Sequence, residues 1–272
     1  MPFSLTVFNN LSIITALLYA GSACLVAVNI ISNTPIQKQR LFVLLTAFSS
    51  VFLHALLVIS SYNVNHAIAN DFFSMLSMVF LVISLLFIVS ASTQAIESLA
   101  IIVFPFSSVA VLLNFGNSIA TIQTASIEAT LQLHIVLSIL SYSLLTVAAF
   151  QAIFLSIQEK QLHNQKPNQF INCLPPLQLM EHLLFRVVFL GLCVLTLALA
   201  TGFVFLEDVF AQHIAHKTVL SILAWIVFAT LLCGRYFFGW RGQKAVKWTY
   251  SGYITLMLAY FGSKFVLQLI LN

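Results

Sequence analysis

Apolar runs long enough to cross a lipid bilayer occupy almost the whole chain. A transmembrane helix needs about 20 consecutive apolar residues, and such runs follow one another along nearly all 272 residues. Only 7% of the residues are charged, against about a quarter in soluble domains. We therefore expect an all-α polytopic transmembrane helix bundle that forms a single integral membrane domain over residues 1–272. Eight spans are predicted, at residues 7–31, 41–60, 72–91, 99–115, 132–157, 187–205, 219–238 and 249–271.

Two segments depart from the simple pattern of long apolar spans. The fourth run is short and contains Pro105, a break that neighbouring helices can absorb in a membrane. The longest polar stretch, from Gln158 to Arg186, predicts a loop followed by a short amphipathic helix, Leu177 to Phe185, at the membrane interface. This stretch indicates either a connector inside one bundle or a boundary between two domains.

Basic residues cluster in alternate connections between the predicted spans. Of the eleven Lys and Arg residues, nine fall on one side of the bundle, which the positive-inside rule makes cytoplasmic. With eight spans this places both termini outside, so we predict an N-out/C-out topology. The nine residues are Lys38, Arg40, Lys160, Lys166, Arg186, Arg235, Arg241, Lys244 and Lys247.

The acidic residues and cysteines argue against two classes of membrane protein. None of the seven Asp and Glu residues lies in the core of a predicted span, whereas intramembrane carboxylates are typical of proton- or cation-driven pumps. The four cysteines form no C-x-x-C motif, so thiol–disulfide chemistry is not expected. The net charge of +4 follows the positive-inside pattern, and we expect no nucleic-acid partner.

Histidine is the main polar chemistry on the predicted outer side. Imidazole is a good ligand for iron, copper or zinc and is the axial ligand of many haems, although a single loop histidine is also an ordinary interfacial residue. His54 lies inside a span, and an ionisable group at that depth is by default a functional-site hypothesis. The five histidines on the outer side or in the outer half of the membrane are His54, His66, His134, His213 and His216.

His134 opens the fifth predicted span and heads a polar helix face. Ser138, Ser141 and Tyr142 follow it at helical spacings of four, seven and eight residues. Such hydroxyls either orient a ligating ring or hydrogen-bond a neighbouring helix as interhelical glue. The spacing alone favours neither interpretation.

A haem fits the available ligands better than a zinc ion does. A structural zinc site needs four Cys, His or acidic ligands at short spacings, and the predicted outer loops contain no Cys. Two histidines that face each other across a bundle suit a planar, non-covalent b-type haem instead. Lys217 and Lys264 are the two cations on the outer side, and either can pair with the haem propionates. The alternative for Lys264 is that it simply snorkels outward.

Several short stretches, most of them in the second half of the chain, resemble one family. The sequence is similar to the cytochrome c assembly protein superfamily (CcsA/CcmC-like), in the branch of YpjD-like and HemX-like inner-membrane proteins. The stretches are Leu133-His134-Ile135, Ser141-Tyr142-Ser143, Leu174-Pro175-Pro176-Leu177, Met180-Glu181, Thr201-Gly202, His216-Lys217-Thr218-Val219-Leu220-Ser221, Gly239-Trp240-Arg241-Gly242 and Ala259-Tyr260-Phe261-Gly262-Ser263-Lys264.

The resemblance implies a role in handling haem at the outer membrane face. Larger relatives hold haem there and deliver it for attachment to apocytochrome c. His134 matches their outer haem ligand, His54 resembles their membrane-embedded histidine more loosely, and His216 becomes the best iron-ligating partner for His134. The chain departs from those relatives at Leu206 to Thr218, which lacks their tryptophan-rich loop, and at Cys233, where they place another histidine.

Three functions are therefore in competition. The first is a haem-binding protein of the bacterial cytoplasmic (inner) membrane that assists cytochrome c maturation or haem trafficking, with other membrane proteins of cytochrome c maturation or haem synthesis as partners. The second is a non-catalytic regulatory or scaffold subunit of the HemX-like kind. The third is a small-solute or metal-ion transporter whose outer histidines are entry ligands. No catalytic residues are predicted.

Overall fold

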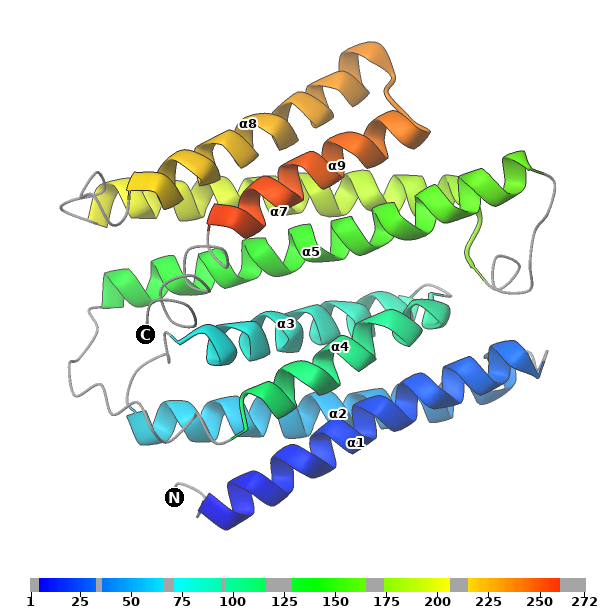
Figure 1. Cartoon of the computed structure of the whole chain (residues 1–272), viewed down its shortest axis with the longest axis vertical. Coiled ribbons are helices and arrows are strands. Elements are labelled where there is room, and N and C mark those ends of the chain that lie inside the picture. The colour runs from blue at the N-terminus through cyan, green and yellow to red at the C-terminus, as the bar shows by residue number, and fades with distance from the viewer. Residues whose placement is uncertain are drawn as a thin grey trace. The chain divides into compact units, whose positions relative to one another are not determined.

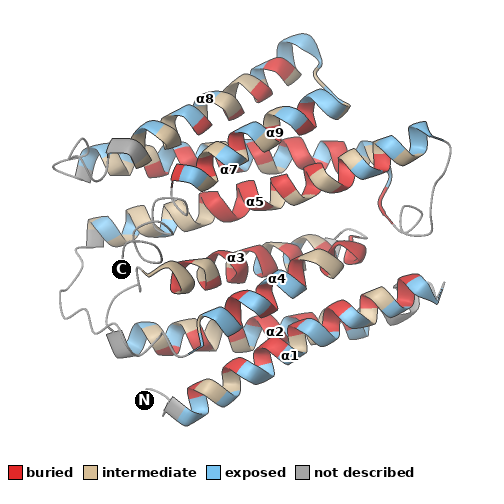
Figure 2. Ribbon diagram, viewed as in Figure 1, coloured by how far each residue is buried: buried red, intermediate tan, exposed pale blue. Residues whose placement is uncertain are grey.

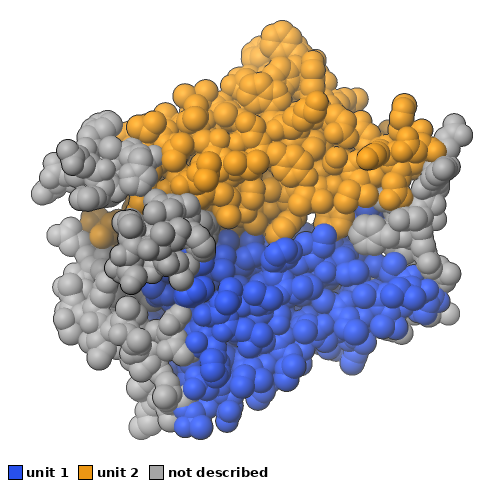
Figure 3. Space-filling model, in the orientation of Figure 1, with its two compact units in different colours: residues 1–127, 168–175 blue, residues 128–167, 176–272 orange. Residues whose placement is uncertain are grey.

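The computed structural model describes residues 5–32, 36–65, 71–93, 96–115, 129–164, 174–205 and 215–259. Within these ranges the regular structure is helical, which confirms the all-α prediction. The chain divides into two compact units (Figure 3). Unit 1 comprises residues 1–127 and 168–175, and unit 2 comprises residues 128–167 and 176–272. The single integral membrane domain stays a prediction.

Unit 1 consists of four α-helices and one short 3-10 helix. α1 packs against both α2 and α4, and α3 packs against α4 and α2 (Figure 1). Their bounds are α1 (Leu5–Ile31), α2 (Ile36–Asn65), α3 (Phe72–Thr93), η1 (Glu97–Leu99) and α4 (Ala100–Leu113).

Unit 2 is built around the long pair α5 and α7. These two helices make the most extensive contact in the unit, and α9 packs against both α5 and α8 (Figure 1). The bounds are α5 (Ala129–His163), α7 (Leu177–Phe205), α8 (Ala215–Phe238) and α9 (Gly242–Met257). The turn from α8 to α9 passes through Gly239 and Gly242, with φ of 63° and 52°, a left-handed conformation that glycine adopts without steric cost.

Buried polar side chains accompany the apolar core inside the units, while many large apolar side chains are exposed; Figure 2 marks the buried and the exposed positions. Ser50 and Ser84 are fully buried, whereas Phe48 and Phe52 are 59% and 54% exposed. Oγ of Ser50 donates to the carbonyl of Thr46, and Oγ of Ser84 lies 2.9 Å from Oγ of Ser107, so these two interior hydroxyls are satisfied. An apolar exterior is what a helix solvated by lipid presents, and the chain is a polytopic helical membrane protein.

Six helices of the described residues are long and apolar enough to cross a membrane, against the eight predicted spans. They run over Thr6–Ile31, Arg40–Asn63, Phe72–Ser92, Thr130–His163, Leu177–Val204 and Lys217–Phe238. The fourth predicted span forms only the 14-residue α4, with Pro105 inside it. At 1.5 Å per residue it is about 21 Å long, shorter than the roughly 30 Å hydrocarbon core. The eighth predicted span extends past residue 259, so its far part lies outside the described residues.

The separate amphipathic helix that we predicted over Leu177–Phe185 is wrong. These residues form the first turns of α7, which continues without a break to Phe205. No glycine or proline interrupts the chain between Leu177 and Arg186, so nothing ends the helix there. The polar residue Glu181 is accommodated inside the helix because two arginines of unit 2 pair with it.

Candidate functional site

His134 lies near the start of α5, against the last turns of α7. Its Nδ1 atom is 2.9 Å from the carbonyl oxygen of Ala198 and 3.2 Å from Oγ1 of Thr201. The hydroxyl of Thr201 is itself within donating distance of the Leu197 and Ala198 carbonyls. Its lone pairs therefore remain to accept a share of the imidazole proton, and α7 supplies two acceptors for one ring nitrogen.

This contact fixes which nitrogen of His134 carries the proton. A backbone carbonyl can only accept, so Nδ1 must donate to Ala198. In the neutral ring Nε2 is then unprotonated, and it makes no hydrogen bond to any residue that the structure describes. Histidines that ligate metals characteristically donate the opposite N–H to a carbonyl or carboxylate, which fixes tautomer and ring orientation. His134 thus presents a lone pair in the form that a haem iron binds.

Gly202 makes room for the His134 ring. A Cβ atom added at this position would lie 3.1 Å from Cε1 of His134, closer than an ordinary van der Waals contact. The Thr201-Gly202 pair therefore serves the histidine twice, through a hydroxyl acceptor and through the absence of a side chain. This explains why two of the stretches that carried the family resemblance, Leu133-His134-Ile135 and Thr201-Gly202, belong together in space.

Two further candidates, His216 and Lys217, belong to the same end of unit 2 as His134. α5 begins, α7 ends and α8 begins at this end of the unit (Figure 1). His216 and Lys217 stand in the first turn of α8, and Lys217 is partly buried. The side chain of His216 is outside the described part of the structure, as is Lys264, so their pairing with His134 and with a propionate stays a prediction.

The hydroxyls below His134 join helices inside unit 2. Oγ of Ser141 donates to the carbonyl of Gly191 on α7 at 3.3 Å, and the Tyr142 hydroxyl donates to the carbonyl of Leu256 on α9 at 3.2 Å. Both side chains are buried. Of the two interpretations that the sequence left open, these contacts favour interhelical hydrogen bonding for Ser141 and Tyr142.

His54 occupies the core of unit 1 and has both ring nitrogens in hydrogen-bonding contact. It is 1% exposed, with Nδ1 3.3 Å from the Tyr19 hydroxyl and Nε2 2.8 Å from Oγ of Ser77. A metal ion would have to replace one of these hydroxyls. His54 is therefore less ready than His134 to ligate iron in this arrangement, and its role in haem binding stays a prediction.

The other described titratable groups do not add to these two histidine sites. His163 and His182 are exposed, while His66 and His213 lie outside the described residues. Among the described residues, no three His, Cys, Asp or Glu side chains lie close enough together to hold a metal ion.

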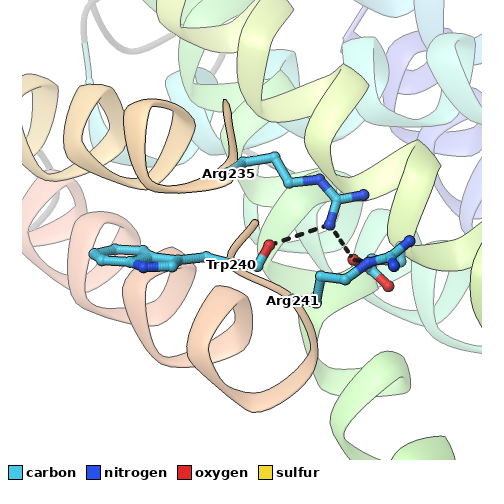
Figure 4. A network of polar contacts seen from close by, with 4 residues as sticks. Arg235, Trp240 and Arg241 are labelled. Carbon is cyan, nitrogen blue, oxygen red and sulfur yellow. Dashed lines mark hydrogen bonds and ion pairs between the residues drawn. The ribbon is translucent and has the colours of Figure 1, made fainter. Parts of the chain in front are cut away.

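The opposite end of unit 2 carries an ion-pair network that the sequence analysis did not predict (Figure 4). Oε1 of Glu181, on α7, accepts from Nη1 of Arg235 at 2.7 Å and from Nε of Arg241 at 3.1 Å. Nη1 of Arg235 also lies 3.2 Å from the carbonyl oxygen of Trp240. The guanidinium carbon of Arg235 is 4.6 Å from the centre of the Phe185 ring. The network ties the end of α8 and the following turn to the start of α7.

A simpler ion pair closes one end of unit 1. Nε of Arg40 lies 2.6 Å from Oε1 of the buried Glu97, and Nη2 donates to the carbonyl of Ala91 at the end of α3 at 2.7 Å. Both networks join opposite charges near span ends in a chain with few charges. The sequence could have indicated these ion pairs, because an acidic residue near the end of a span lies in a low-dielectric setting and requires a basic partner.

Comparison with known proteins identifies a family that this sequence matches. Residues 42–271 match the model of the family described as cytochrome C assembly protein. The chain is 42% identical to the inner membrane protein YpjD of Escherichia coli K12 over 146 residues, which cover 53% of this chain and 55% of that protein. It is 33% identical over 144 residues to an uncharacterized 28.8 kDa protein of Azospirillum brasilense, covering 52% and 53% of the two chains.

A more distant relative is named for cytochrome c biogenesis. The cytochrome c biogenesis protein CcsA of Chlamydomonas reinhardtii is 27% identical over 136 residues, which cover 48% of this chain and 37% of that protein. The alignments thus span about half the length of the nearer relatives and less of the distant one. No solved structure is significantly similar. Because the family model matches most of its length, the chain belongs to the cytochrome c assembly protein family, as the resemblance predicted.

Proposed function

We propose that this protein binds haem in the membrane and assists cytochrome c maturation or haem trafficking. The geometry of His134 carries the proposal: the ring packs against Gly202, and Nδ1 donates to the Ala198 carbonyl, which leaves on Nε2 the lone pair that iron binds. Family membership supports the same function. When bound, the haem supplies an iron centre that accepts axial imidazole nitrogens.

The residues assigned to the haem belong to unit 2, with one further candidate in unit 1. His134 and His216 would hold the haem iron through their imidazole nitrogens, with His54 a separate candidate in unit 1. Lys217 and Lys264 are assigned to the propionates, for which a charge-assisted hydrogen bond is the expected contact. Lys217 stands at the start of α8, at the same end of unit 2 as His134.

The proposal includes an orientation in the inner membrane. With the basic residues inside and both termini outside, the His134 end of unit 2 faces outward and the Glu181 end faces the cytoplasm. The similar YpjD protein is named as an inner membrane protein, and we place this multi-pass chain there as well. Membrane proteins of cytochrome c maturation or haem synthesis are the partners proposed.

An optical spectrum of the purified protein tests the proposal. Full-length protein from haem-replete cells should show a Soret band and a b-type pyridine haemochrome, and His134→Ala should abolish both. His182→Ala is the matched control, because His182 is an exposed histidine at the far end of unit 2. A colourless wild-type protein, or a Soret band that survives His134→Ala, would contradict the haem function.

One sequence feature keeps a second function in consideration. Residues 206–218 occupy the place of the tryptophan-rich loop of larger haem-handling relatives and contain no Trp. A HemX-like regulatory or scaffold subunit, which binds another membrane protein without carrying haem, would need no such loop. Copurification of a stoichiometric membrane partner with colourless protein would favour this function. Retention of a metal ion without pigment would instead point to a transporter.

A further inference from the structure

The turn between α8 and α9 forms a compact corner that the haem proposal does not use. We define the corner as Tyr236–Trp248, the last turn of α8, the turn itself and the first turns of α9. The α8 span ends at Phe238, so this corner lies where the membrane meets water. It combines exposed aromatic side chains with exposed cations.

The corner is held rigidly by contacts to α5 and α7. Arg241 is fixed through Nε to Glu181, and Nε2 of Gln243 donates to Oε2 of Glu159 at 3.0 Å. The Trp240 ring lies directly on Gly234, where an added Cβ would come within 2.3 Å of it. Trp248 also lies against this ring, at 5.3 Å between centroids. The turn and the Arg241 side chain are therefore held in place before any ligand arrives.

Three cations of the corner, Arg241, Lys244 and Lys247, are exposed. Lys244 and Lys247 are exposed and lie three residues apart, so they share one face of α9, whose first residue follows Arg241. Arg241 contacts Glu181 through Nε alone, and its side chain is 66% exposed. Nζ of Lys244 lies 5.7 Å from the Trp240 ring centre, a cation–π contact that restrains the ammonium group. The nearby acids, Glu181 and Glu159, leave an excess of positive charge.

The aromatic side chains of the corner are exposed on the protein surface. Tyr236, Phe237 and Phe238 are 83%, 71% and 76% exposed, and they form the last three residues of the span. Aromatic side chains at a span end insert at the level of the lipid headgroups and upper acyl chains. Apolar anchors and cations thus occur next to each other at the depth where a phospholipid has its own apolar and anionic parts.

We propose that this corner binds the headgroup of an anionic phospholipid. Arg241, Lys244 and Lys247 hold the phosphate, and Tyr236 to Phe238 lie against the acyl chains. Free phosphate would use the cations alone and gain nothing from three exposed aromatic side chains, so the lipid is the occupant that accounts for both features. The proposal is independent of haem binding and of which leaflet contains the corner.

The test is a lipid titration of the purified full-length protein in neutral detergent. Dihexanoyl phosphatidylglycerol is the probe, dihexanoyl phosphatidylcholine the neutral comparison, and tryptophan fluorescence the readout, since two of the three Trp residues, Trp240 and Trp248, lie in the corner. Binding of phosphatidylglycerol should be saturable. Lys244→Gln with Lys247→Gln should weaken it about thirtyfold, because each lysine near an anionic lipid contributes roughly a fivefold effect.

A matched double variant separates a site from general charge attraction. Lys160→Gln with Arg186→Gln removes the same charge from exposed positions at the same end of unit 2 and should leave the affinity unchanged. An unchanged circular-dichroism spectrum and melting temperature must accompany the loss in the lysine variant. Equal binding of the two lipids, an equal loss in both double variants, or full competition by millimolar inorganic phosphate would overturn the proposal.

Discussion

The Nδ1 atom of His134 on α5 lies 2.9 Å from the carbonyl oxygen of Ala198 on α7. The carbonyl belongs to a helix interior, where it also accepts from its own helix, so the imidazole takes the second lone pair of the oxygen. A rigid helix therefore sets the orientation of the ring. Any haem bound by Nε2 would inherit that orientation, and changes at the α7 surface should reach the iron through His134.

The first prediction concerns the space beside the His134 ring. Gly202→Ala places a Cβ 3.1 Å from Cε1, so the ring must shift or tilt. We expect a displaced Soret maximum and a weaker haem complex, with the helical content retained.

Gly21→Ala is the control for this substitution. Gly21 lies within α1 and has nothing within 4 Å of an added Cβ, so the alanine should stabilise the protein by up to about 1 kcal/mol through helix propensity. An unchanged haem spectrum in Gly202→Ala would show that the ring has more freedom than the structure indicates.

The second prediction concerns the hydroxyl that shares the His134 proton. Thr201→Val keeps the side-chain shape but removes the acceptor 3.2 Å from Nδ1, which should lower haem affinity by about tenfold, at the lower end of the range for groups behind a metal ligand. Thr201→Ser should restore the affinity. Haem transfer to apomyoglobin measures the difference. A valine variant as tight as the wild type would show that the Ala198 carbonyl suffices.

The sequence predicts the long helices of this fold better than the short one. Long apolar runs predicted the six spans because a bilayer imposes a minimum length on any helix that crosses it. α4 failed that test, although its composition is equally apolar, since only 14 residues are helical and Pro105 is among them. At the start of α7 the prediction was wrong for a different reason. A polar residue there, Glu181, made the first turns of a spanning helix resemble a separate interfacial helix.

The candidate site was only partly predictable for a related reason. The sequence singled out His134 because a polar helix face follows it and because it matches a family motif. Its acceptor is a backbone carbonyl, that of Ala198, and every residue type has such a carbonyl, so the sequence could not indicate this contact. The Glu181 network joins residues 54 and 60 positions apart. Periodicity describes one helix at a time, and so it does not report which helices become neighbours.

The third prediction compares the two acids at the Glu181 end of unit 2. Glu181→Gln removes the charge that two arginines share, leaving a partly buried Arg235 without a counter-ion. We expect a loss of about 2 kcal/mol, in the range for hydrogen bonds to charged groups. Glu159→Gln removes the charge from a single exposed amide contact but keeps an oxygen that can accept it, and should cost less than about 1 kcal/mol. Thermal unfolding in detergent measures both, and equal losses would contradict the assigned importance of the network.

The fourth prediction asks whether His54 holds its place by hydrogen bonds or serves as an iron ligand. Ser77→Ala and Tyr19→Phe each remove one hydroxyl from the ring. Polar contacts between membrane helices average about 0.6 kcal/mol, so each variant should lower stability by roughly that amount and leave any haem spectrum unaltered. His54→Gln, which retains hydrogen-bonding capacity, should behave likewise. Loss of part of the Soret absorbance in His54→Gln, with the melting temperature preserved, would instead identify His54 as a ligand, because a purely structural residue cannot change the iron spectrum without changing stability.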